Sequence, residues 1–376
     1  MRLARLALTD FRNYSELTWQ PRGRVAAIWG PNGSGKTNLL EAISLLVPGR
    51  GLRGARLGEL ARHGGRAWAV AGRFEAPEEG FDIGTGTPPG GPAERRVFRL
   101  DGAAPRSQAE IAARVAAVWL TPQMDRLFQE GASGRRRFLD RLVFALEPGH
   151  AREVSAHDSA MAQRNRLLAE GRADAAWLAG LEEAMARHAV AAAASRAALV
   201  GHLNAALAGG IAGAFPVARL GLVCPIAERL ARDPALAVED WLRAALATGR
   251  GADARAGSAG LGAHRADMAL TDAVTGRPAG LASTGQQKAL LVAVVLGHAA
   301  LIAQARGAAP LLLLDEPAVH LDPDHRQALF AALASLPAQV FLTGTDRETF
   351  LPLRDLAEGL RTGEDTVRPD PEFHPA

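Results

Sequence analysis

The feature that most constrains the fold is the sequence GPNGSGKT at residues 30–37, which fits the phosphate-loop pattern G-x-x-x-x-G-K-S/T. The segment before it, RVAAIWG (24–30), is a short apolar run that predicts a buried strand. The segment after it, TNLLEAISLLV (37–47), has apolar residues at helical spacing and stops at a Pro-Gly pair. Because the motif works only between a strand and a helix, this context predicts an α/β nucleotide-binding domain rather than a chance match in a glycine-rich chain.

Each position of this loop has a physical task. Glycines turn backbone N–H groups toward phosphates, and the following helix presents its N-terminus to the same anions. Lys36, which we also count as catalytic, supplies a positive charge to the β- and γ-phosphates, and the Thr37 hydroxyl is a Mg²⁺ ligand. The predicted nucleotide-binding residues of the loop are Gly30, Pro31, Asn32, Gly33, Ser34, Gly35, Lys36, Thr37 and Asn38.

The second half of such a site is a strand that ends in an aspartate, and LLLLDEP (311–317) supplies it. Four leucines bury the strand, and Asp315 emerges at its tip, where other P-loop ATPases hold Mg²⁺. Glu316 is then placed to orient or deprotonate the attacking water. The alternative is a buried strand that only happens to be followed by an acidic turn. We predict that Asp315 holds the magnesium ion and that Glu316 is catalytic.

A polar segment, STGQQ (283–287), precedes a long apolar run, and HLD (320–322) follows Asp315. Alone, STGQQ is a helix cap. In this order the motifs resemble the ABC ATPases, whose signature motif binds the γ-phosphate held by the opposite subunit. The resemblance predicts signature residues Ser283, Thr284, Gly285, Gln286 and Gln287, and a D-loop at the dimer interface with Asp322. Magnesium ATP is the implied cofactor, and an ATP-dependent homodimer is the implied assembly.

Lysine is almost absent from the chain. Lysine and arginine together number 43, and all but Lys36 and Lys288 are arginine. This bias is typical of a GC-rich genome, and it makes the two lysines notable. Lys288 lies one turn inside the helix that follows STGQQ, where it points at phosphate, points at DNA, or is a solvated base. The sequence leaves these three alternatives open.

The hydrophobic pattern changes between about residues 130 and 250, where no segment has the alternation or short apolar runs typical of strands. Residues 156–171 and 173–210 read as helices of about 14 and 35 residues, joined near Gly171 and able to pack as an antiparallel hairpin. Residues 249–262 have a flexible composition, and residues 76–95 suggest a loop or hairpin turn. We predict an α/β ATPase head formed by residues 1–125 and 262–376, with a helical insertion, or arm, at 126–261.

No sequence feature indicates a membrane or a redox site. Cys224 is the only cysteine, which excludes an internal disulfide and a cysteine-based zinc site. The N-terminus lacks the apolar core of a signal peptide. The apolar run 289–303 is shorter than about 18 residues and reads as a buried core helix. We expect a cytosolic protein that does not contact a membrane.

Several further segments resemble the RecF family, which belongs to the SMC-like branch of the ABC ATPases. They span most of the chain and occur in family order. The segments are FRNYSELTW (11–19), GPNGSGKTNLLEAI (30–43), SGRRRFLDRLV (133–143), AQRNRLLAEG (162–171), GAHRADMAL (262–270), STGQQKALL (283–291) and QVFLTGT (339–345). The resemblance implies an ABC/SMC-type P-loop head with an inserted helical arm.

The resemblance also implies a function. Family members are ATP-dependent DNA-binding proteins of gap repair, replication-fork maintenance and the SOS response, with slow ATP hydrolysis that DNA accelerates. They act with RecO and RecR in loading the recombinase. By position, Arg12 and Asn13 would lie near the nucleotide phosphates, and Gln123 would sit in the loop that contributes a magnesium ligand. His264 and Arg265 would mark the junction of insertion and head. In many members a second aspartate follows the first, whereas this chain has Glu316, closer to the general ABC form.

The DNA-contacting residues are less constrained by sequence. One set of arginines lies in the insertion and would track DNA phosphates, or would be solvated helix faces in an arginine-rich chain. With one tyrosine and scattered tryptophans, base stacking is not the expected binding mode. Two rival functions are a transporter-type ABC ATPase and a DNA clamp with a decayed ATPase. The arginines in question are Arg135, Arg136, Arg137, Arg152, Arg164, Arg166, Arg187 and Arg196.

Overall fold

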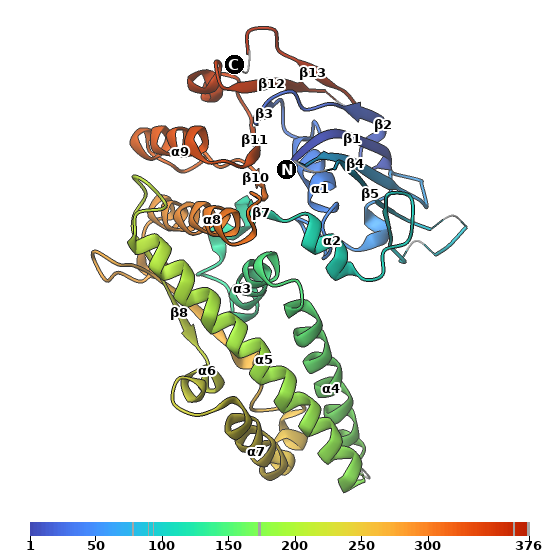
Figure 1. The fold of residues 1–376 in the computed structure, drawn as a ribbon, viewed down its shortest axis with the longest axis vertical. Helices are drawn as coiled ribbons and strands as arrows, with labels where there is room; N and C mark the ends of the chain where they lie inside the picture. Colours follow the sequence, from blue (N-terminus) through green and yellow to red (C-terminus); the bar gives the residue numbers. More distant parts are fainter. Residues whose placement is uncertain (77–78, 89, 93, 172–173, 364, 374–376) are drawn as a thin grey trace. The chain divides into compact units, whose positions relative to one another are not determined.

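The computed structural model describes residues 1–76, 79–88, 90–92, 94–171, 174–363 and 365–373. It divides into two compact units, coloured along the chain in Figure 1. The first unit, the head, comprises residues 1–125, 210–217 and 283–376. The second unit, the arm, comprises residues 126–209 and 218–282. The head is therefore assembled from both ends of the chain, as the sequence predicts.

The core of the head is a six-stranded sheet of order β13-β12-β3-β11-β10-β7. Its four central pairings, from β12 through β3, β11 and β10 to β7, are parallel, and β13 adds an antiparallel edge. Strands β3, β10 and β11 are buried on both faces, which explains their continuous apolar sequences. The strands are β3 (Val25–Trp29), β7 (Ala117–Leu120), β10 (Leu311–Leu314), β11 (Gln339–Gly344), β12 (Ala357–Thr362) and β13 (Val367–Pro369).

A second, antiparallel sheet of the head has the order β2-β1-β4-β5-β6. Strand β4 alternates buried and exposed residues, as expected for a sheet with one face turned to solvent. Helix α1 (Lys36–Ser44) contacts strands of both sheets and so lies between them (Figure 1). The strands are β1 (Arg2–Phe11), β2 (Tyr14–Trp19), β4 (Ala69–Glu75), β5 (Phe81–Gly86) and β6 (Val97–Leu100). Helix α1 is therefore held from two sides where it leaves the phosphate loop.

Three more helices complete the head: α2 (Gln108–Arg114), α8 (Thr284–Arg306) and α9 (Pro323–Ser335). The apolar run 289–303 lies within α8, which packs against β7 and α9. By length and composition, α8 and one arm helix could cross a membrane. Most of α8 is buried inside the head, as predicted for a core helix.

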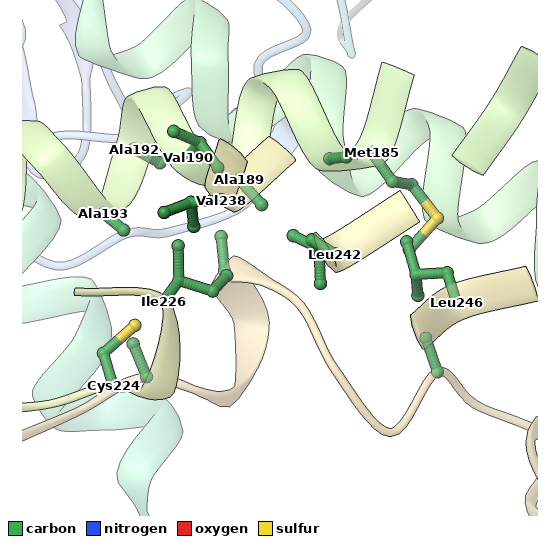
Figure 2. Packing of buried hydrophobic residues seen from close by; sticks show 14 of the residues in the cluster. Met185, Ala189, Val190, Ala192, Ala193, Cys224, Ile226, Val238, Leu242 and Leu246 are labelled. Atoms are coloured by element: carbon green, nitrogen blue, oxygen red, sulfur yellow. The ribbon is translucent and has the colours of Figure 1, made fainter. Parts of the chain in front are cut away.

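The arm contains a helical hairpin. Helix α4 (His150–Glu170) packs along α5 (Ala175–Ala208), as Figure 1 shows. The apolar core of the arm joins α5 to α6 (Pro225–Leu230) and α7 (Ala235–Ala256). Figure 2 shows Met185 and Val190 of α5 facing Leu242 and Leu246 of α7, with Ile226 of α6 beside them. Helix α3 (Ala132–Leu146) leads into this hairpin.

The arm differs from the prediction in two places. A two-stranded sheet joins β8 (Ala218–Val223) to β9 (Asp267–Asp272), so strands do occur in the region expected to be wholly helical. This pairing brings residues 262–282 into the arm, so the second boundary falls at 283 instead of 262. Residues 249–256 are the last part of α7 and not a flexible linker, because Leu246 and the buried Asp253 anchor that helix.

Two predicted connections fall partly outside the described residues. The predicted loop at 76–95 contains β5, and its residues 77, 78, 89 and 93 are outside the described residues. The predicted helix joint near Gly171 lies at the end of α4, where Gly171 has the left-handed φ of 68° that favours glycine. Residues 172 and 173, which follow it, are outside the described residues.

Candidate nucleotide-binding site

The phosphate loop connects β3 to α1, as the sequence predicts. Gly33 and Gly35 have φ values of 84° and 94°, which side-chain-bearing residues rarely adopt. A Cβ atom at Gly35 would also lie 2.6 Å from the Asn13 amide and 2.8 Å from the Tyr14 hydroxyl. Glycine at 35 therefore serves both the backbone conformation and a close approach. Helix α1 begins at Lys36, so its free N–H groups face the loop.

Lys36 is folded over the loop. Its Nζ donates hydrogen bonds to the carbonyl oxygens of Gly30, at 2.7 Å, and Pro31, at 3.0 Å. Burial lowers the pKa of Lys36, and the carboxylates of Glu316 and Asp315 act in the opposite direction. The ammonium group thus lies within the electrostatic reach of both predicted acidic residues. An ammonium has three donors, so one remains for a phosphate oxygen.

Asp315 is the meeting point of two segments of the head. Its Oδ1 accepts a hydrogen bond from the Thr37 hydroxyl at 3.0 Å and another from the Thr343 hydroxyl at 2.7 Å. Asp315 follows β10, Thr343 lies at the end of β11, and Thr37 opens α1. Parallel strands bring their carboxyl ends to one edge of the sheet, which is where α/β folds place ligand sites. Two of the three predicted magnesium ligands, Thr37 and Asp315, are therefore adjacent.

Glu316 has an unusual backbone conformation. Its φ is 50°, in the left-handed region that non-glycine residues seldom occupy. Its N–H donates to Thr343 Oγ1 at 3.0 Å, and its carbonyl oxygen accepts from Lys288 Nζ at 3.0 Å. Within the described part of the chain, its carboxylate makes no hydrogen bond. Strained backbone at a catalytic position is a recurring feature of active sites. The main chain of Glu316 is fixed, and its carboxylate is free to engage a water molecule.

The donor set fits magnesium. Mg²⁺ prefers oxygen ligands and is usually held by one or two protein groups together with substrate phosphates and water. Thr37 Oγ1 and Asp315 Oδ1, within 3.0 Å of each other, provide such a pair. Among the described residues there is no cluster of three or more His, Cys, Asp or Glu side chains that would form an all-protein metal cage. The pair therefore suits an ion shared with a nucleotide.

Gln123, the third predicted magnesium ligand, is exposed and lies in the 3₁₀ turn η2 (Pro122–Arg126). This turn follows β7, whose last residue, Leu120, accepts a hydrogen bond from the N–H of Asp315 at 2.9 Å. Gln123 is thus on the same sheet edge as Asp315. No contact of its side chain tests the metal role, which stays a prediction.

The signature segment opens helix α8. The Ser283 hydroxyl accepts from the N–H of Gln286, and the Gln286 side chain accepts from the N–H of Ser283, which is a capping box. Ser283, Thr284 and Gln286 are exposed, and Gln287 is buried. A Cβ atom at Gly285 would lie 2.8 Å from the carbonyl oxygen of His320. Glycine at 285 therefore lets the signature turn pack directly on the D-loop.

Asp322 caps the helix after the D-loop. It accepts hydrogen bonds from the His325 N–H at 2.8 Å and from the His325 ring at 2.7 Å. Val319, three residues earlier, is an exposed large apolar side chain. An exposed apolar residue beside the D-loop is consistent with an interface, but the dimer role of Asp322 stays a prediction.

The FRNY element packs against the phosphate loop. The Tyr14 hydroxyl donates to the Gly35 carbonyl at 3.2 Å, and burial raises the Tyr14 pKa to about 12. Asn13 Oδ1 accepts from the Asn38 amide at 2.7 Å. The Arg12 guanidinium forms two hydrogen bonds, of 2.8 and 2.9 Å, with the buried carboxylate of Glu41 on α1. Asn13 is thus at the loop, whereas the charge of Arg12 is engaged by Glu41, and its phosphate role stays a prediction.

Lys288 does not match two of the three alternatives left open by the sequence. Its side chain is 1 % exposed. A solvated base and a DNA-facing base are therefore both wrong. Its ammonium group contacts Glu316 and Asp125 instead.

Four of the predicted DNA-contacting arginines are engaged inside the arm. Arg164 is 0 % exposed and donates to Glu182 and Asp253, and Arg196, also buried, forms two hydrogen bonds with Asp140. For these two the prediction of a DNA surface is wrong, because buried charges are retained through internal pairs. Arg135 pairs with Asp267, and Arg136 donates to the Ala266 carbonyl. The exposed members of the set are Arg137, Arg152, Arg166 and Arg187.

Two other predicted residues lie in the arm. His264 and Arg265 form the 3₁₀ turn η3 (Ala263–Arg265). Both donate from their side chains to the carbonyl oxygen of Ala259. Burial lowers the pKa of His264. These residues close a turn within the arm segment 218–282, and after them the chain re-enters the head at residue 283.

The sequence did not reveal Thr343 or Glu41 as site residues. Thr343 was part of QVFLTGT, which identified the strand and the family but gave no role to the hydroxyl. Its position at the end of the strand beside β10 was the available signal, because that edge holds Asp315. The sequence around Glu41 predicts only a helix, although an acid in an apolar helical segment is a signal for a buried partner.

Comparison with known proteins decides the family. The chain matches the model of the RecF/RecN/SMC N terminal domain over residues 2–365. It is 45 % identical over 371 residues to the DNA replication and repair protein RecF of Mesorhizobium japonicum, covering 98 % of this chain and 97 % of that protein. It is also 45 % identical over 376 residues to RecF of Caulobacter vibrioides, covering 96 % of each. The chain belongs to the RecF family.

Solved structures agree on the fold of this RecF-family chain. The recombination mediator protein RecF-ATPrS of the RecFOR pathway superposes with a TM-score of 0.84 at 22 % identity, covering 98 % of each chain. The Smc head domain of Pyrococcus furiosus, with an extended coiled coil and bound to part of ScpA, has a TM-score of 0.52 at 16 % identity, covering 98 % of this chain and 95 % of that one. The predicted ABC/SMC-type head with an inserted helical arm is confirmed.

Proposed function

We propose that this RecF-family chain binds magnesium ATP, closes into a homodimer on DNA, and slowly hydrolyses ATP in recombinational gap repair. In this role it acts in the cytoplasm at single-stranded, double-stranded or gapped DNA, and supports RecO and RecR in loading the recombinase. Replication-fork maintenance and the SOS response belong to the same function. The observation that carries the proposal is the link Thr37–Asp315–Thr343, which brings the phosphate loop and the acidic pair to one sheet edge.

The catalytic step follows from this arrangement. The loop N–H groups and Lys36 hold the phosphates and offset their charge. Thr37, Asp315 and Gln123 are the groups that would hold the magnesium ion, which would offset the negative charge of the phosphates. Glu316 orients a water molecule and accepts its proton as the water oxygen bonds to the γ-phosphorus. The bond between that phosphorus and the ADP oxygen breaks, giving ADP and phosphate.

Dimerisation is supported by the exposed start of α8. Ser283 and Thr284 present hydroxyls, and the first turn of α8 presents unpaired backbone N–H groups, so this end of the helix suits a phosphate. In the proposed dimer, the signature of one copy binds the γ-phosphate held by the other. ATP then controls the association of the two heads.

DNA contact is supported most clearly by a segment of the head that we call the basic loop, residues 50–66. It contains five arginines against a single acid, Glu59. Arg50 and Arg56 line a hollow of about 400 Å³ together with Arg96. Arg96 is used internally, because it donates to carbonyl oxygens of the segment that follows α1, and burial lowers its pKa to about 9. All five arginines of the loop are exposed: Arg50, Arg53, Arg56, Arg62 and Arg66.

The basic loop differs from the buried arm arginines in what its charges contact. The side chains of Arg50 and Arg56 have no hydrogen-bond or ion-pair partner within the described residues. Unpaired arginines can exchange bound anions for DNA phosphates, and this gives salt-dependent, sequence-independent binding. The basic loop is therefore our proposed phosphate-contacting surface of the head.

Size-exclusion chromatography with light scattering tests the proposal. The native chain should shift from monomer to dimer with ATP, and a gapped duplex should strengthen the shift and speed hydrolysis. Lys36→Ala should show neither, because the loop loses the charge that holds the phosphates. If ATP binds to the native chain without forming a dimer, the signature role of residues 283–287 is wrong.

Two other functions make different predictions. A transporter-type motor would hydrolyse ATP without response to DNA. A clamp with a decayed ATPase would give Glu316→Gln the same turnover as the native chain. The intact Lys36, Asp315 and free Glu316 carboxylate favour real catalysis, so Glu316→Gln should retain the ATP-bound dimer and lose turnover.

A further inference from the structure

Lys288 is a buried charge to which the proposed chemistry gives no task. Its Nζ donates to the carbonyl oxygen of Glu316 at 3.0 Å and lies 3.4 Å from Asp125 Oδ2. Burial lowers the pKa of Lys288, while the carboxylates of Asp125 and Glu316 favour its charged form. A buried charge costs free energy unless it is paired, so this lysine is retained for what it contacts.

One contact fixes the main chain of Glu316. With φ at 50°, this residue is held in a strained conformation that persists only where its surroundings impose it. Thr343 binds its N–H and Lys288 binds its carbonyl oxygen, so the peptide units on both sides are pinned. A rotation of this backbone would swing the carboxylate away from the water it must orient. Lys288 therefore helps to set the direction of a side chain that it does not touch.

The other contact reaches the point where the chain leaves the head. Asp125 lies in η2, five residues after the end of β7, and the arm begins at the next residue, 126. Its Oδ2 faces Lys288, and its Oδ1 is buried with no hydrogen-bond partner among the described residues. Lys288 is thus an ionic partner of this carboxylate. Any shift of the η2 turn would therefore change the position of the ammonium group that binds the Glu316 carbonyl oxygen.

The choice of lysine is informative in a chain that otherwise uses arginine. A guanidinium is planar and spreads its donors over a wide fork, whereas an ammonium is compact and directs three donors from one atom. At a position that is 1 % exposed, between a carbonyl oxygen and a carboxylate, the compact group fits the two acceptors. The physical demand of this position accounts for one of the two lysines, as phosphate binding accounts for the other.

We propose that Lys288 is a positioning residue that orients catalytic Glu316 and couples it to Asp125, the last head residue before the arm begins. The signature helix, the catalytic turn and the exit to the arm then share one buried contact. A change in the arm or in the signature is converted into a change in the direction of the Glu316 carboxylate. The inference rests on the proposed ATPase function, because it concerns how turnover is controlled.

Lys288→Met tests the first half, since methionine has similar length and no charge. ATP binding, followed with a fluorescent ATP analogue, and KM should stay within about twofold, because Lys36, Thr37 and Asp315 are unchanged. The kcat should fall about ten- to a hundredfold, as expected for a misplaced catalytic group. The ATP-dependent dimer should persist, as in Glu316→Gln. A purely structural role in α8 would instead remove dimer and turnover together, which would overturn the inference, as would native turnover.

Asp125→Asn tests the second half and serves if Lys288→Met fails to fold. Its amide oxygen can still face Lys288, but the ionic attraction is gone. Turnover without DNA should stay within about twofold, and the stimulation by a gapped duplex should drop to less than half. Unchanged stimulation would overturn the coupling. If the native chain itself shows no turnover, the proposed ATPase function fails instead, and the two failures are therefore distinguishable.

Discussion

At the scale of single residues, the sheet edge that carries Asp315 and Glu316 depends on hydroxyl groups as much as on charges. Thr343 accepts from the N–H of Glu316 and donates to Asp315 with one oxygen atom. It thereby aligns the side chain of Asp315 and the backbone of Glu316 with each other. Its neighbour in this role, Thr37, approaches Asp315 from the phosphate loop. The two threonines hold one carboxylate oxygen from two sides.

Replacing Thr343 with valine tests whether the hydroxyl group matters, because the two side chains have nearly the same size. Valine keeps the shape, but it removes the hydrogen-bond partner of the Glu316 N–H and one of the two donors to Asp315 Oδ1, which costs about 1–3 kcal/mol. We expect a lower midpoint in urea denaturation and a loss of turnover of about tenfold or more. Thr343→Ser is the matched control and should retain most of both. Equal behaviour of the valine and serine variants would contradict the role of the hydroxyl.

The residues that sequence alone could not assign share a physical reason. Lys36, Thr37, Asp315 and Glu316 belong to contiguous motifs, so the sequence predicts their roles and their places at the ends of one helix and one strand. The role of Thr343 depends on a partner 28 positions away, and that of Glu41 on Arg12, 29 positions away. Lys288 was visible as an anomaly of composition, yet its partners, Asp125 and Glu316, belong to other segments. Burial and partners are properties of the packed chain, and no local pattern reports them.

At the scale of elements, the arm is held together by buried ion pairs as well as by its apolar core. Asp140 of α3 receives hydrogen bonds from His150 of α4 and from Arg196 of α5. Burial acts to raise the pKa of Asp140, but these hydrogen bonds and the charge of Arg196 outweigh it and lower the pKa. One carboxylate thus joins three helices.

This network should make arm stability depend on pH. Because the pKa of Asp140 is lower in the folded state, its contribution is present above its unfolded pKa of about 3.9 and is lost as pH falls through the folded pKa. Urea denaturation of the full chain, followed from pH 6 down to pH 3, should show this slope. In Asp140→Asn the slope should be smaller, with lower stability at pH 6. Asp240→Asn, from an exposed pair with Arg243, is the control and should change little.

Helices and strands were predicted well where the hydrophobic periodicity was strong. They were predicted poorly where contacts between distant segments determine the structure. The strand and helix around the phosphate loop, the buried strand before Asp315 and the long helical hairpin matched expectation. Strand β8 was missed because its pairing with β9 joins segments about 50 residues apart. The same pairing moved the boundary of the arm from 262 to 283. The flexible composition of residues 249–256 was overridden by the packing of α7.

At the scale of the whole molecule, the charge distribution makes a prediction about DNA. Arg50→Ala with Arg56→Ala should weaken binding to a gapped duplex and reduce the salt dependence of log affinity by about one for each phosphate that is no longer neutralised. The matched control is Arg166→Ala with Arg187→Ala, which removes two exposed arginines from the arm. Fluorescence anisotropy over a range of salt concentrations measures both. A larger loss of affinity in the arm variant would contradict this prediction and would indicate that DNA binds to the arm.

The order of strands in the head has a consequence for biosynthesis. Strand β3, which carries the phosphate loop, pairs on one side with β11 and on the other with β12. Both neighbours lie beyond residue 338. During translation β3 therefore cannot pair with either strand until most of the chain has been synthesised. The arm, whose residues lie between 126 and 282, emerges complete well before that point. A nascent chain that has not reached residue 339 therefore lacks both sheet neighbours of β3, the strand that leads into the phosphate loop.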